Sequence, residues 1–313
     1  MNTPKRQYYT LVQSCRDIYQ EQGNVSAFLR KSLGLEQNTP EIIEISYDMQ
    51  AGSYVQQFQQ NPQDQYAYCT EISGYLDKYL DTQDSLAEVG CGEATTTLGV
   101  FDRLKLKPVQ VIGFDISFSR IKVAIDFWNR EYRKLESQSQ STANFFVADL
   151  FHIPLADKSV DVVYTSHSIE PNGGREVEAL ESIFRIARKR VLLFEPCFEA
   201  SSPEIQKRIN SHGYIKGIPA AIQAAGGILR HVDKLENISN PLNPTYLFDI
   251  ELPSDSRSMS NSISWADPVT MKPLDKQEDC FYCPTSGLVY PIIRGIPCLR
   301  PENGILATQL MNL

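Results

Sequence analysis

The strongest candidates for chemistry are three acidic residues, each associated with the end of a short apolar stretch. Glu88 lies within residues 86–89, Asp115 follows residues 109–114, and Asp149 follows residues 144–148. Each stretch has the length and composition of a buried strand. Because open parallel sheets bind ligands beyond the carboxyl ends of their strands, the three carboxylates are expected to gather at one binding site.

The turn after the first of these strands narrows the kind of ligand. Gly90 and Gly92 stand one residue apart, and three threonines and a return to apolar residues follow. This pattern predicts a strand, a tight turn and a helix start whose free amide groups face a ligand. A dinucleotide site would need a glycine where Thr95 stands, so that pattern fails. An acid two residues before Gly90 suits a ligand with a cationic amino group. Taken alone, the turn could also be one without a ligand.

The stretch Glu88-Val89-Gly90-Cys91-Gly92, with Ala94 in place of a third glycine, resembles the first motif of class I S-adenosylmethionine-dependent methyltransferases. The Tyr-Asp…Ala…Tyr element of residues 47–54 also resembles a segment that precedes the core in that family. The resemblance, which covers roughly residues 40–252, implies S-adenosylmethionine as the cofactor. Asp115 would accept hydrogen bonds from its ribose and Asp149 from its adenine amino group, while an aromatic residue would shield the sulfonium. The residues expected to bind the cofactor are Tyr47, Tyr54, Glu88, Gly90, Cys91, Gly92, Asp115, Ile116, Asp149, Leu150 and Ser166. The two tyrosines could alternatively be ordinary packing residues.

The loop after the fourth strand, residues 165–176, holds the candidates for catalysis. Transfer of a methyl group from a sulfonium is an in-line displacement, which needs alignment more than reactive groups. A base helps where the acceptor is a hydroxyl or an ammonium. His167 is the best placed base, Glu170 is next, Arg175 could hold an anionic acceptor, and His212 is a weaker second candidate. The loop departs from a common version in the family that carries a Glu-His pair, so the identity of a base stays open. His167 could instead bind only backbone.

The rest of the pattern predicts an α/β fold. From residue 85 onward strands alternate with helices, which predicts a parallel sheet with crossover helices. By resemblance this is a Rossmann-like seven-stranded methyltransferase sheet, with an antiparallel edge hairpin formed by residues 228–235 and 245–252. We expect helices over residues 8–20, 24–33 and 66–80, an exposed loop over 56–65, and a polar irregular insert over 197–218 that contacts the substrate.

Four segments are expected along the chain: a helical N-terminal cap over residues 1–80, the S-adenosylmethionine-binding core over 81–252, a Ser-rich linker over 253–264, and a small β-rich module over 265–313. The last of these resembles a zinc-ribbon-like family whose members include methyltransferase activators. Metal-binding members begin with a Cys-Pro-x-Cys pair, where this chain has Asp267 to Thr270. Cys280 and Cys283 have metal-like spacing, but a structural zinc needs four ligands. The module is therefore expected to be metal-free. A piece this small buries little surface, so we expect it to pack on a methyltransferase core, its own or that of a second chain in a homodimer.

The composition indicates which classes of partner this protein is expected to have. The net charge of −8 argues against a nucleic-acid partner. The sequence has no apolar run long enough to span a membrane and no signal peptide at its start. Seven scattered cysteines fit reduced thiols in the cytoplasm. The expected activity is methyl transfer to an O or N atom of a small molecule, such as a sugar or a natural product. The alternatives are an RNA or protein methyltransferase, suggested by the last segment, and a non-enzymatic cofactor-binding regulator, against which the intact acids argue.

Overall fold

A computed structural model describes residues 5–133, 141–237, 242–253 and 263–310 of the chain. Its centre is a seven-stranded sheet in the order β3-β2-β1-β4-β5-β7-β6, in which β7 runs antiparallel to both of its neighbours. The strands are β1 (Ser85–Val89), β2 (Gln110–Asp115), β3 (Thr142–Val147), β4 (Val160–Ser166), β5 (Ala187–Pro196), β6 (Ile228–Lys234) and β7 (Thr245–Glu251). The predicted α/β class, the methyltransferase-type sheet and its antiparallel edge hairpin are confirmed.

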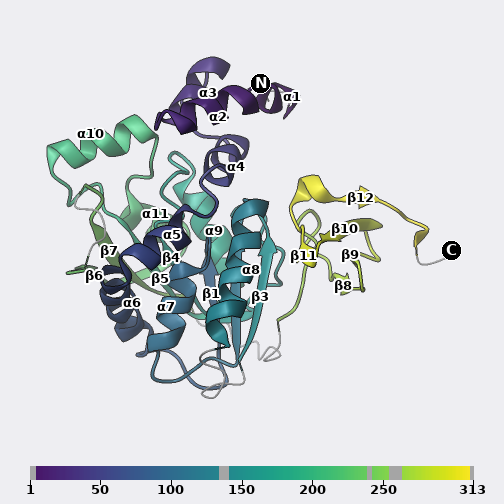
Figure 1. Cartoon of the computed structure of the whole chain (residues 1–313). Coiled ribbons are helices and arrows are strands. Elements are labelled where there is room, and N and C mark those ends of the chain that lie inside the picture. The colour runs from purple at the N-terminus through teal and green to yellow at the C-terminus, as the bar shows by residue number, and fades with distance from the viewer. Residues whose placement is uncertain (1–4, 134–140, 238–241, 254–262, 311–313) are drawn as a thin grey trace.

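Helices cover both faces of this sheet (Figure 1). On the face turned toward the viewer lie α6 (Pro62–Leu76), α7 (Thr95–Arg103) and α8 (Phe118–Tyr132), and on the other lie α9 (Glu176–Ile186) and α11 (Ile218–Ala224). All five residues of β1 are buried, and so are all but the last residue of β4. Because both faces are covered, these strands are nearly continuous apolar runs, which explains why they could be predicted from the sequence.

Five further helices precede the sheet: α1 (Lys5–Thr10), α2 (Val12–Gln20), α3 (Val25–Leu33), α4 (Pro40–Asp48) and α5 (Ser53–Gln60). The helix predicted over residues 8–20 is interrupted at Leu11, which separates α1 from α2. The helix predicted over 24–33 is confirmed: the Asn24 side chain accepts a hydrogen bond from the backbone N–H of Ala27, and Gly34 ends the helix with φ of 67°. α1 to α4 enclose a small core of their own around Leu29 and Ile42, both fully buried.

Two predicted irregular segments are helical, so those predictions were wrong. Residues 56–65 belong to α5 and α6, and the insert after β5 contains α10 (Pro203–His212). α5 has no fully buried residue and α10 buries only Ile209, so each has only a short apolar face. Ser202 caps α10 by accepting from the backbone N–H of Ile205, Pro203 opens it, and Gly213 closes it. These cap residues were the available signal.

The C-terminal segment forms a second, small antiparallel sheet from β8 (Asp275–Lys276), β9 (Cys280–Tyr282), β10 (Leu288–Ile293), β11 (Ile296–Pro297) and β12 (Ile305–Leu306), with a 3₁₀ turn at Pro301–Asn303. In Figure 1 it stands beside β3, the edge strand of the large sheet. Cys298 pairs in parallel with Val147 at the end of β3, and the backbone N–H of Leu299 donates to Val147 O at 2.8 Å. The ring of Trp265 lies 5.0 Å from both Phe146 of the large sheet and Phe281 of β9. The segment thus packs on its own core, as expected.

A buried carboxylate, that of Asp267, organises this segment. Asp267 is fully buried and accepts hydrogen bonds from the Val269 backbone, the hydroxyls of Thr270 and Ser286, and the phenol of Tyr290, at 2.7–3.0 Å. Burial alone would raise the pKa of Asp267, but these donors hold it below its ordinary value. Within the described ranges no group of three or more His, Cys, Asp or Glu residues is placed to hold a metal ion.

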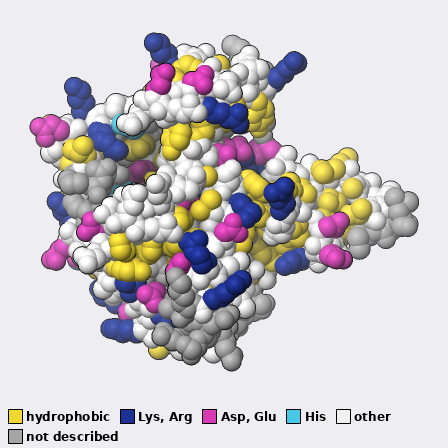
Figure 2. Space-filling model, viewed as in Figure 1, with side chains coloured by type: hydrophobic (Ala, Val, Ile, Leu, Met, Phe, Trp, Pro, Cys, Tyr) yellow, Lys and Arg dark blue, Asp and Glu magenta, His cyan; other side chains and the backbone are white. Residues whose placement is uncertain are grey.

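The described residues can be compared with the expectations drawn from composition about membrane spans, cysteines and charge. None of their helices is both long and apolar enough to cross a membrane. All seven cysteines are buried and unpaired. On the face shown in Figure 2, basic side chains are scattered among acidic ones over the large domain.

Candidate functional site

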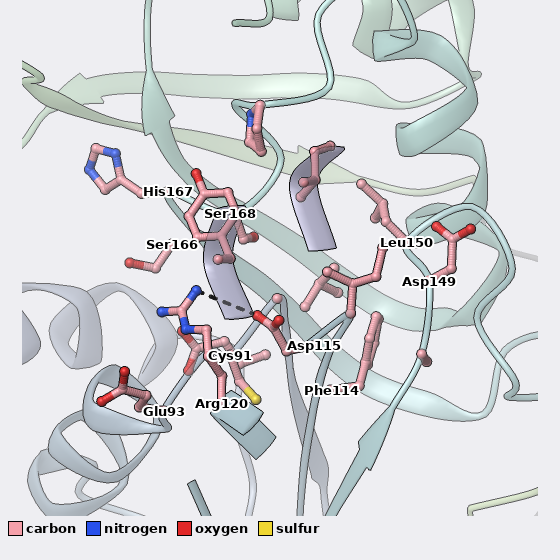
Figure 3. Close-up of a pocket in the computed structure, with 18 of the residues that line it drawn as sticks. Cys91, Glu93, Phe114, Asp115, Arg120, Asp149, Leu150, Ser166, His167 and Ser168 are labelled. Carbon is pink, nitrogen blue, oxygen red and sulfur yellow. Dashed lines mark ion pairs between the residues drawn. The ribbon is translucent and has the colours of Figure 1, made fainter. Parts of the chain in front are cut away.

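A cavity opens where β1, β2, β3 and β4 end, beneath α4 and α5 (Figure 3). It holds about 910 Å³ of space free of protein atoms, part of it open to solvent. Of the eleven residues expected to bind the cofactor, all but Gly92 line this cavity: Tyr47, Tyr54, Glu88, Gly90, Cys91, Asp115, Ile116, Asp149, Leu150 and Ser166. The strand order brings them together from positions more than a hundred residues apart.

The turn after β1 has the tight geometry that its glycines suggested. Gly90 has φ of 66°, and a β-carbon there would lie 2.4 Å from the β-carbon of Ser168. A larger residue would therefore push the loop after β4 away from the turn. Ala94, in place of the family's third glycine, keeps a left-handed backbone with φ of 58°. The turn thus retains its shape without the third glycine.

Glu88 is buried at the base of the cavity with 2% of its surface exposed. Its Oε2 accepts hydrogen bonds from the hydroxyl of Thr97 on α7 and from the phenol of Tyr164 on β4, the latter at 2.7 Å. Burial raises the pKa of Glu88 to about 7, although both hydrogen bonds oppose that rise. The carboxylate is thus held rigidly and can change its charge near neutral pH.

Asp115 at the end of β2 is held by the two turns beside it. Its Oδ2 accepts from the backbone N–H of Gly92 at 3.1 Å, and its Oδ1 accepts from that of Ser117 at 2.9 Å. Each carboxylate oxygen can accept more than one hydrogen bond, so Asp115 retains acceptor capacity toward the cavity.

Arg120 is a cavity residue that the sequence analysis missed. The Arg120 Nη1 lies 3.9 Å from Asp115 Oδ2, and Figure 3 shows this ion pair in the middle of the cavity. The guanidinium lies over the rings of Tyr47 and Tyr54, with centroid distances of 5.4 and 4.7 Å. Burial alone would lower the pKa of Arg120, but Asp115 and the other acidic groups around the guanidinium outweigh this effect and raise the pKa above its ordinary value. Its position one turn into α8 carried no motif that could have revealed it.

Both carboxylate oxygens of Asp149 are engaged by neighbouring groups of its own loop. Its Oδ1 accepts from the backbone N–H of Phe151 at 3.0 Å, and its Oδ2 lies 3.1 Å from the Nδ1 of His152. In Figure 3 the carboxylate lies across the cavity from Arg120. Burial would raise the pKa of Asp149, but the His152 hydrogen bond leads the contacts that lower it below the ordinary value. The direct contact expected with an adenine amino group stays a prediction.

Helices α4 and α5 form a lid over the cavity, fastened by two carboxylates. Glu93, in the glycine turn, accepts from the backbone N–H groups of Gly52 and Val55 at 2.9 and 2.8 Å, and so holds the first turn of α5. Asp48, at the end of α4, accepts from the backbone N–H of Ser119 and from the hydroxyls of Ser117 and Ser119 at the start of α8. The lid and the binding turns therefore stabilise each other.

His167 lies at the boundary between this cavity and a second one, and its imidazole points away from Asp115 (Figure 3). Its Nδ1 lies 3.2 Å from Glu170 Oε2, and its Nε2 lies 2.6 Å from the hydroxyl of Thr245. The Asn243 amide nitrogen lies 3.0 Å from the same Glu170 oxygen. Burial lowers the pKa of His167, but the hydrogen bond and charge of Glu170 outweigh it, so the net pKa is raised. His167 also has φ of 52°, a strained value often found at functional sites.

The other predicted catalytic residues lie in different places. Glu170 lines the second cavity, next to His167. Arg175 lines neither cavity: its guanidinium pairs with Glu178 and lies 3.4 Å from the ring centroid of Phe151. The imidazole of His212 lies near the ring of Tyr214, and its backbone oxygen accepts from Arg30. Glu195, which no sequence motif indicated, anchors the loop after β4 by accepting from the backbone N–H of Ser168 at 3.0 Å.

Comparisons with known proteins agree with this geometry. Residues 87–194 match a family model described as a methyltransferase domain. A curated Schizosaccharomyces pombe protein, named as an uncharacterized methyltransferase, is 27% identical over 154 residues, which are 45% of this chain and 54% of that protein. The chain thus spans about half of the length of this curated relative.

Solved structures share the fold at low sequence identity. One is the complex between the Haloferax volcanii Trm112 methyltransferase activator and the putative methyltransferase, with a TM-score of 0.51 and 16% identity, covering 68% of this chain and 100% of that chain. Another is a SAM-dependent methyltransferase from Methanosarcina mazei, with a TM-score of 0.48 and 14% identity over 58% of this chain and 98% of that chain. The match to a methyltransferase domain thus covers residues 87–194, which extend from within β1 to within β5 of the large sheet.

Proposed function

Because residues 87–194 match this domain, we propose that the chain is an S-adenosylmethionine-dependent methyltransferase acting on an O or N atom of a small molecule. The observation that carries the proposal is the single cavity lined by Glu88, Asp115 and the turn at Gly90. A buried acid whose pKa lies near neutrality suits a cationic amino group, and Asp115 suits two sugar hydroxyls. S-adenosylmethionine carries both, and when bound it supplies a sulfonium methyl group as the electrophile.

The residues between the two cavities support a role in alignment and proton removal. If the Glu170 carboxylate accepts from the Nδ1–H of His167, then Nε2 of the neutral ring is the basic nitrogen. Nε2 is hydrogen-bonded to Thr245, so the acceptor's hydroxyl or ammonium would replace this partner. As the acceptor's lone pair forms the new bond to carbon and the carbon–sulfur bond breaks, the acceptor's proton would pass to His167.

A second candidate is a methyltransferase of RNA or protein with a fused activator-like module. It is favoured by the backbone pairing of Cys298 with Val147, which attaches the activator-like C-terminal sheet to the edge of the core. The matched Haloferax volcanii structure is a complex with a methyltransferase activator. The net charge of −8 and the mixed charges of the visible face favour the small-molecule acceptor instead.

The test separates cofactor from acceptor. Calorimetry with S-adenosylmethionine should show binding, and Asp115→Ala should weaken it by about 2–4 kcal/mol through the loss of one or two charge-assisted hydrogen bonds. Asp126→Ala, on the exposed side of α8, is the matched control. With methyl-labelled cofactor and fractionated cell extract, label should enter the small-molecule fraction. Label in RNA or protein alone would favour the second candidate, and absence of cofactor binding would refute both.

A further inference from the structure

The second cavity adjoins the cofactor cavity and is more polar. It holds about 1070 Å³ of space free of protein atoms and shares six lining residues with the first. The shared residues are Tyr47, Tyr54, Thr95, Thr96, Ser166 and His167. The second cavity alone is lined by Tyr68, Arg208 and Tyr214, among others, and the glutamate beside the predicted base also lies there. A molecule in this space would therefore reach His167 and the cofactor cavity together.

Arg208 on α10 brings a positive charge to this cavity. Its Nη1 is buried, and within the part of the chain that the structure describes it has no hydrogen-bond acceptor. The guanidinium carbon lies 5.7 Å from the ring centroid of Tyr214. A buried guanidinium nitrogen without an acceptor loses its hydration with no compensation, which is unfavourable unless a ligand supplies an oxygen.

The position of Arg208 is fixed by contacts from the N-terminal helices. The guanidinium of Arg30 on α3 donates to the backbone oxygens of Ser211 and His212 at 2.9 and 3.1 Å, and so caps the end of α10. The Asn38 amide donates to the same His212 oxygen and to Pro171 O in the catalytic loop. α10 is therefore held against the catalytic loop, and Arg208 is presented to the cavity at a set distance from His167.

We propose that the acceptor is a small organic acid whose oxyanion, a carboxylate or a phosphate, is bound by Arg208 while its reacting hydroxyl or amine meets His167. This inference rests on the proposed function, because it assigns the acceptor of that site. A guanidinium presents paired N–H donors that match the two oxygens of such a group. The Asn243 Oδ1, also buried and without a donor among the described residues, would accept from a neutral hydroxyl or amine of the same molecule.

The tyrosines of the cavity indicate the rest of the acceptor. Tyr47, Tyr54, Tyr68 and Tyr214 line it, and burial raises the pKa of Tyr47, Tyr68 and Tyr214, so these three are neutral phenols near pH 7. Their rings offer apolar, polarisable surfaces between Arg208 and the cofactor cavity. An aromatic acid would pack against them with its charge at Arg208, which makes simple aromatic anions suitable probes.

The experiment titrates benzoate, phenyl phosphate and the neutral benzamide into the full chain saturated with S-adenosylhomocysteine, using calorimetry. At least one anion should bind ten or more times more tightly than benzamide. Arg208→Gln should abolish this preference and Arg208→Lys should keep part of it. Lys207→Gln, the exposed neighbour on α10, should behave as the unmodified protein. Preference for benzoate or for phenyl phosphate distinguishes the two oxyanions.

Four outcomes would overturn the proposal: no binding of any probe, equal binding of benzamide, a preference that survives Arg208→Gln, or an equal loss in Lys207→Gln. The affinity for S-adenosylhomocysteine is measured in every variant and should not change. If S-adenosylhomocysteine does not bind at all, the proposed function is refuted. The same titrations, carried out on the chain without S-adenosylhomocysteine, then still test by the same criteria whether Arg208 binds an anion.

Discussion

Glu88 illustrates how burial controls the chemistry of a single residue. Its two hydrogen-bond donors come from α7 and β4, and the side chain is almost wholly out of solvent. A folded-state pKa of about 7, against an ordinary value of 4.5, means that the folded chain binds this proton more tightly than the unfolded chain. Stability therefore falls as the pH rises from about 4.5 to about 7.

Replacing Glu88 with Gln should remove this pH dependence. Gln keeps an oxygen that can accept from Thr97 and Tyr164, but it cannot ionise. The unfolding free energy of the variant minus that of the unmodified chain should therefore increase by about 2–3 kcal/mol between pH 5 and pH 8. Urea denaturation at several pH values measures the difference. Glu181→Gln, on the exposed face of α9, should follow the unmodified protein. Parallel curves for Glu88→Gln and the unmodified chain would show that Glu88 does not keep its proton.

The pair of His167 and Glu170 allows a test that needs no acceptor. The chain has only four histidines, so their proton resonances can be followed separately. His167 should titrate above its ordinary value of 6.5, so that the neutral, basic ring becomes the main form only at higher pH. Glu170→Gln removes the neighbouring charge and should move this midpoint to lower pH. Glu178→Gln, in the first turn of α9, should leave the His167 midpoint unchanged. If the midpoint is also unchanged in Glu170→Gln, Glu170 does not position His167.

The acidic residues near strand ends could be predicted because, in the sequence itself, each stands at or next to the end of an apolar run typical of a buried strand. Glu88 lies one residue before the end of its apolar run and Asp115 and Asp149 directly follow theirs, and the sheet order gathers these ends around one cavity. Their partners were not predictable. Tyr164 lies 76 residues from Glu88 and Thr245 lies 78 from His167, so only the folded topology brings them together. Arg208, in an insert that the sequence suggested was irregular, was missed for the same reason.

At the scale of elements, the lid depends on carboxylates that belong to other segments. Glu93 of the glycine turn satisfies two backbone N–H groups at the start of α5, which has no side-chain cap of its own. Val55 and Phe58 of α5 also pack against the core, so apolar contacts and these hydrogen bonds together hold the helix over the cavity. Tyr54, which lines the cavity, is carried by this helix.

Glu93→Ala should therefore loosen the lid. Loss of two hydrogen bonds to a charged group should reduce the unfolding free energy by about 2–3 kcal/mol and weaken cofactor binding as well. Thermal melting and calorimetry measure the two effects. Gln56→Ala, an exposed position on α5, should change neither by more than a few tenths of a kcal/mol. If Glu93→Ala melts normally but loses cofactor affinity, the carboxylate contacts the ligand rather than supporting α5.

The helices that the sequence analysis missed share one physical property. α5 and α10 are short helices on the surface, and their apolar faces consist of only a few residues, most of them partly buried, which is a weak signal in the sequence. Glutamine is a good helix former, and tertiary contacts at the helix ends complete the stabilisation. The capping residues Ser202 and Gly213 of α10 could have been recognised, whereas the cap of α5 comes from Glu93, far along the chain.

At the scale of the molecule, the C-terminal sheet joins the core and the lid. Its hydrogen bonds to Val147 extend the edge of the large sheet, which otherwise would expose unpaired backbone groups. Arg300, 5% exposed, places its Nη1 2.6 Å from Glu44 Oε2 on α4, the helix that also carries Tyr47. The C-terminal segment thus reaches the cofactor cavity through the lid, without lining the cavity itself.

Two variants separate these roles. Truncation after Leu252 uncovers the edge at β3 and the apolar surface around Phe146, so it should lower the melting temperature and promote self-association. Arg300→Gln removes the tie to α4 and a local ion pair with Glu302 but leaves the C-terminal sheet in place. It should lower the melting temperature less than truncation does and weaken cofactor binding measured by calorimetry, because α4 is no longer anchored. Arg294→Gln, on the turn between β10 and β11, is the control and should do neither. If the truncated chain stays soluble and keeps its melting temperature, oligomeric state and cofactor affinity, the C-terminal sheet is an independent module and the coupling is refuted.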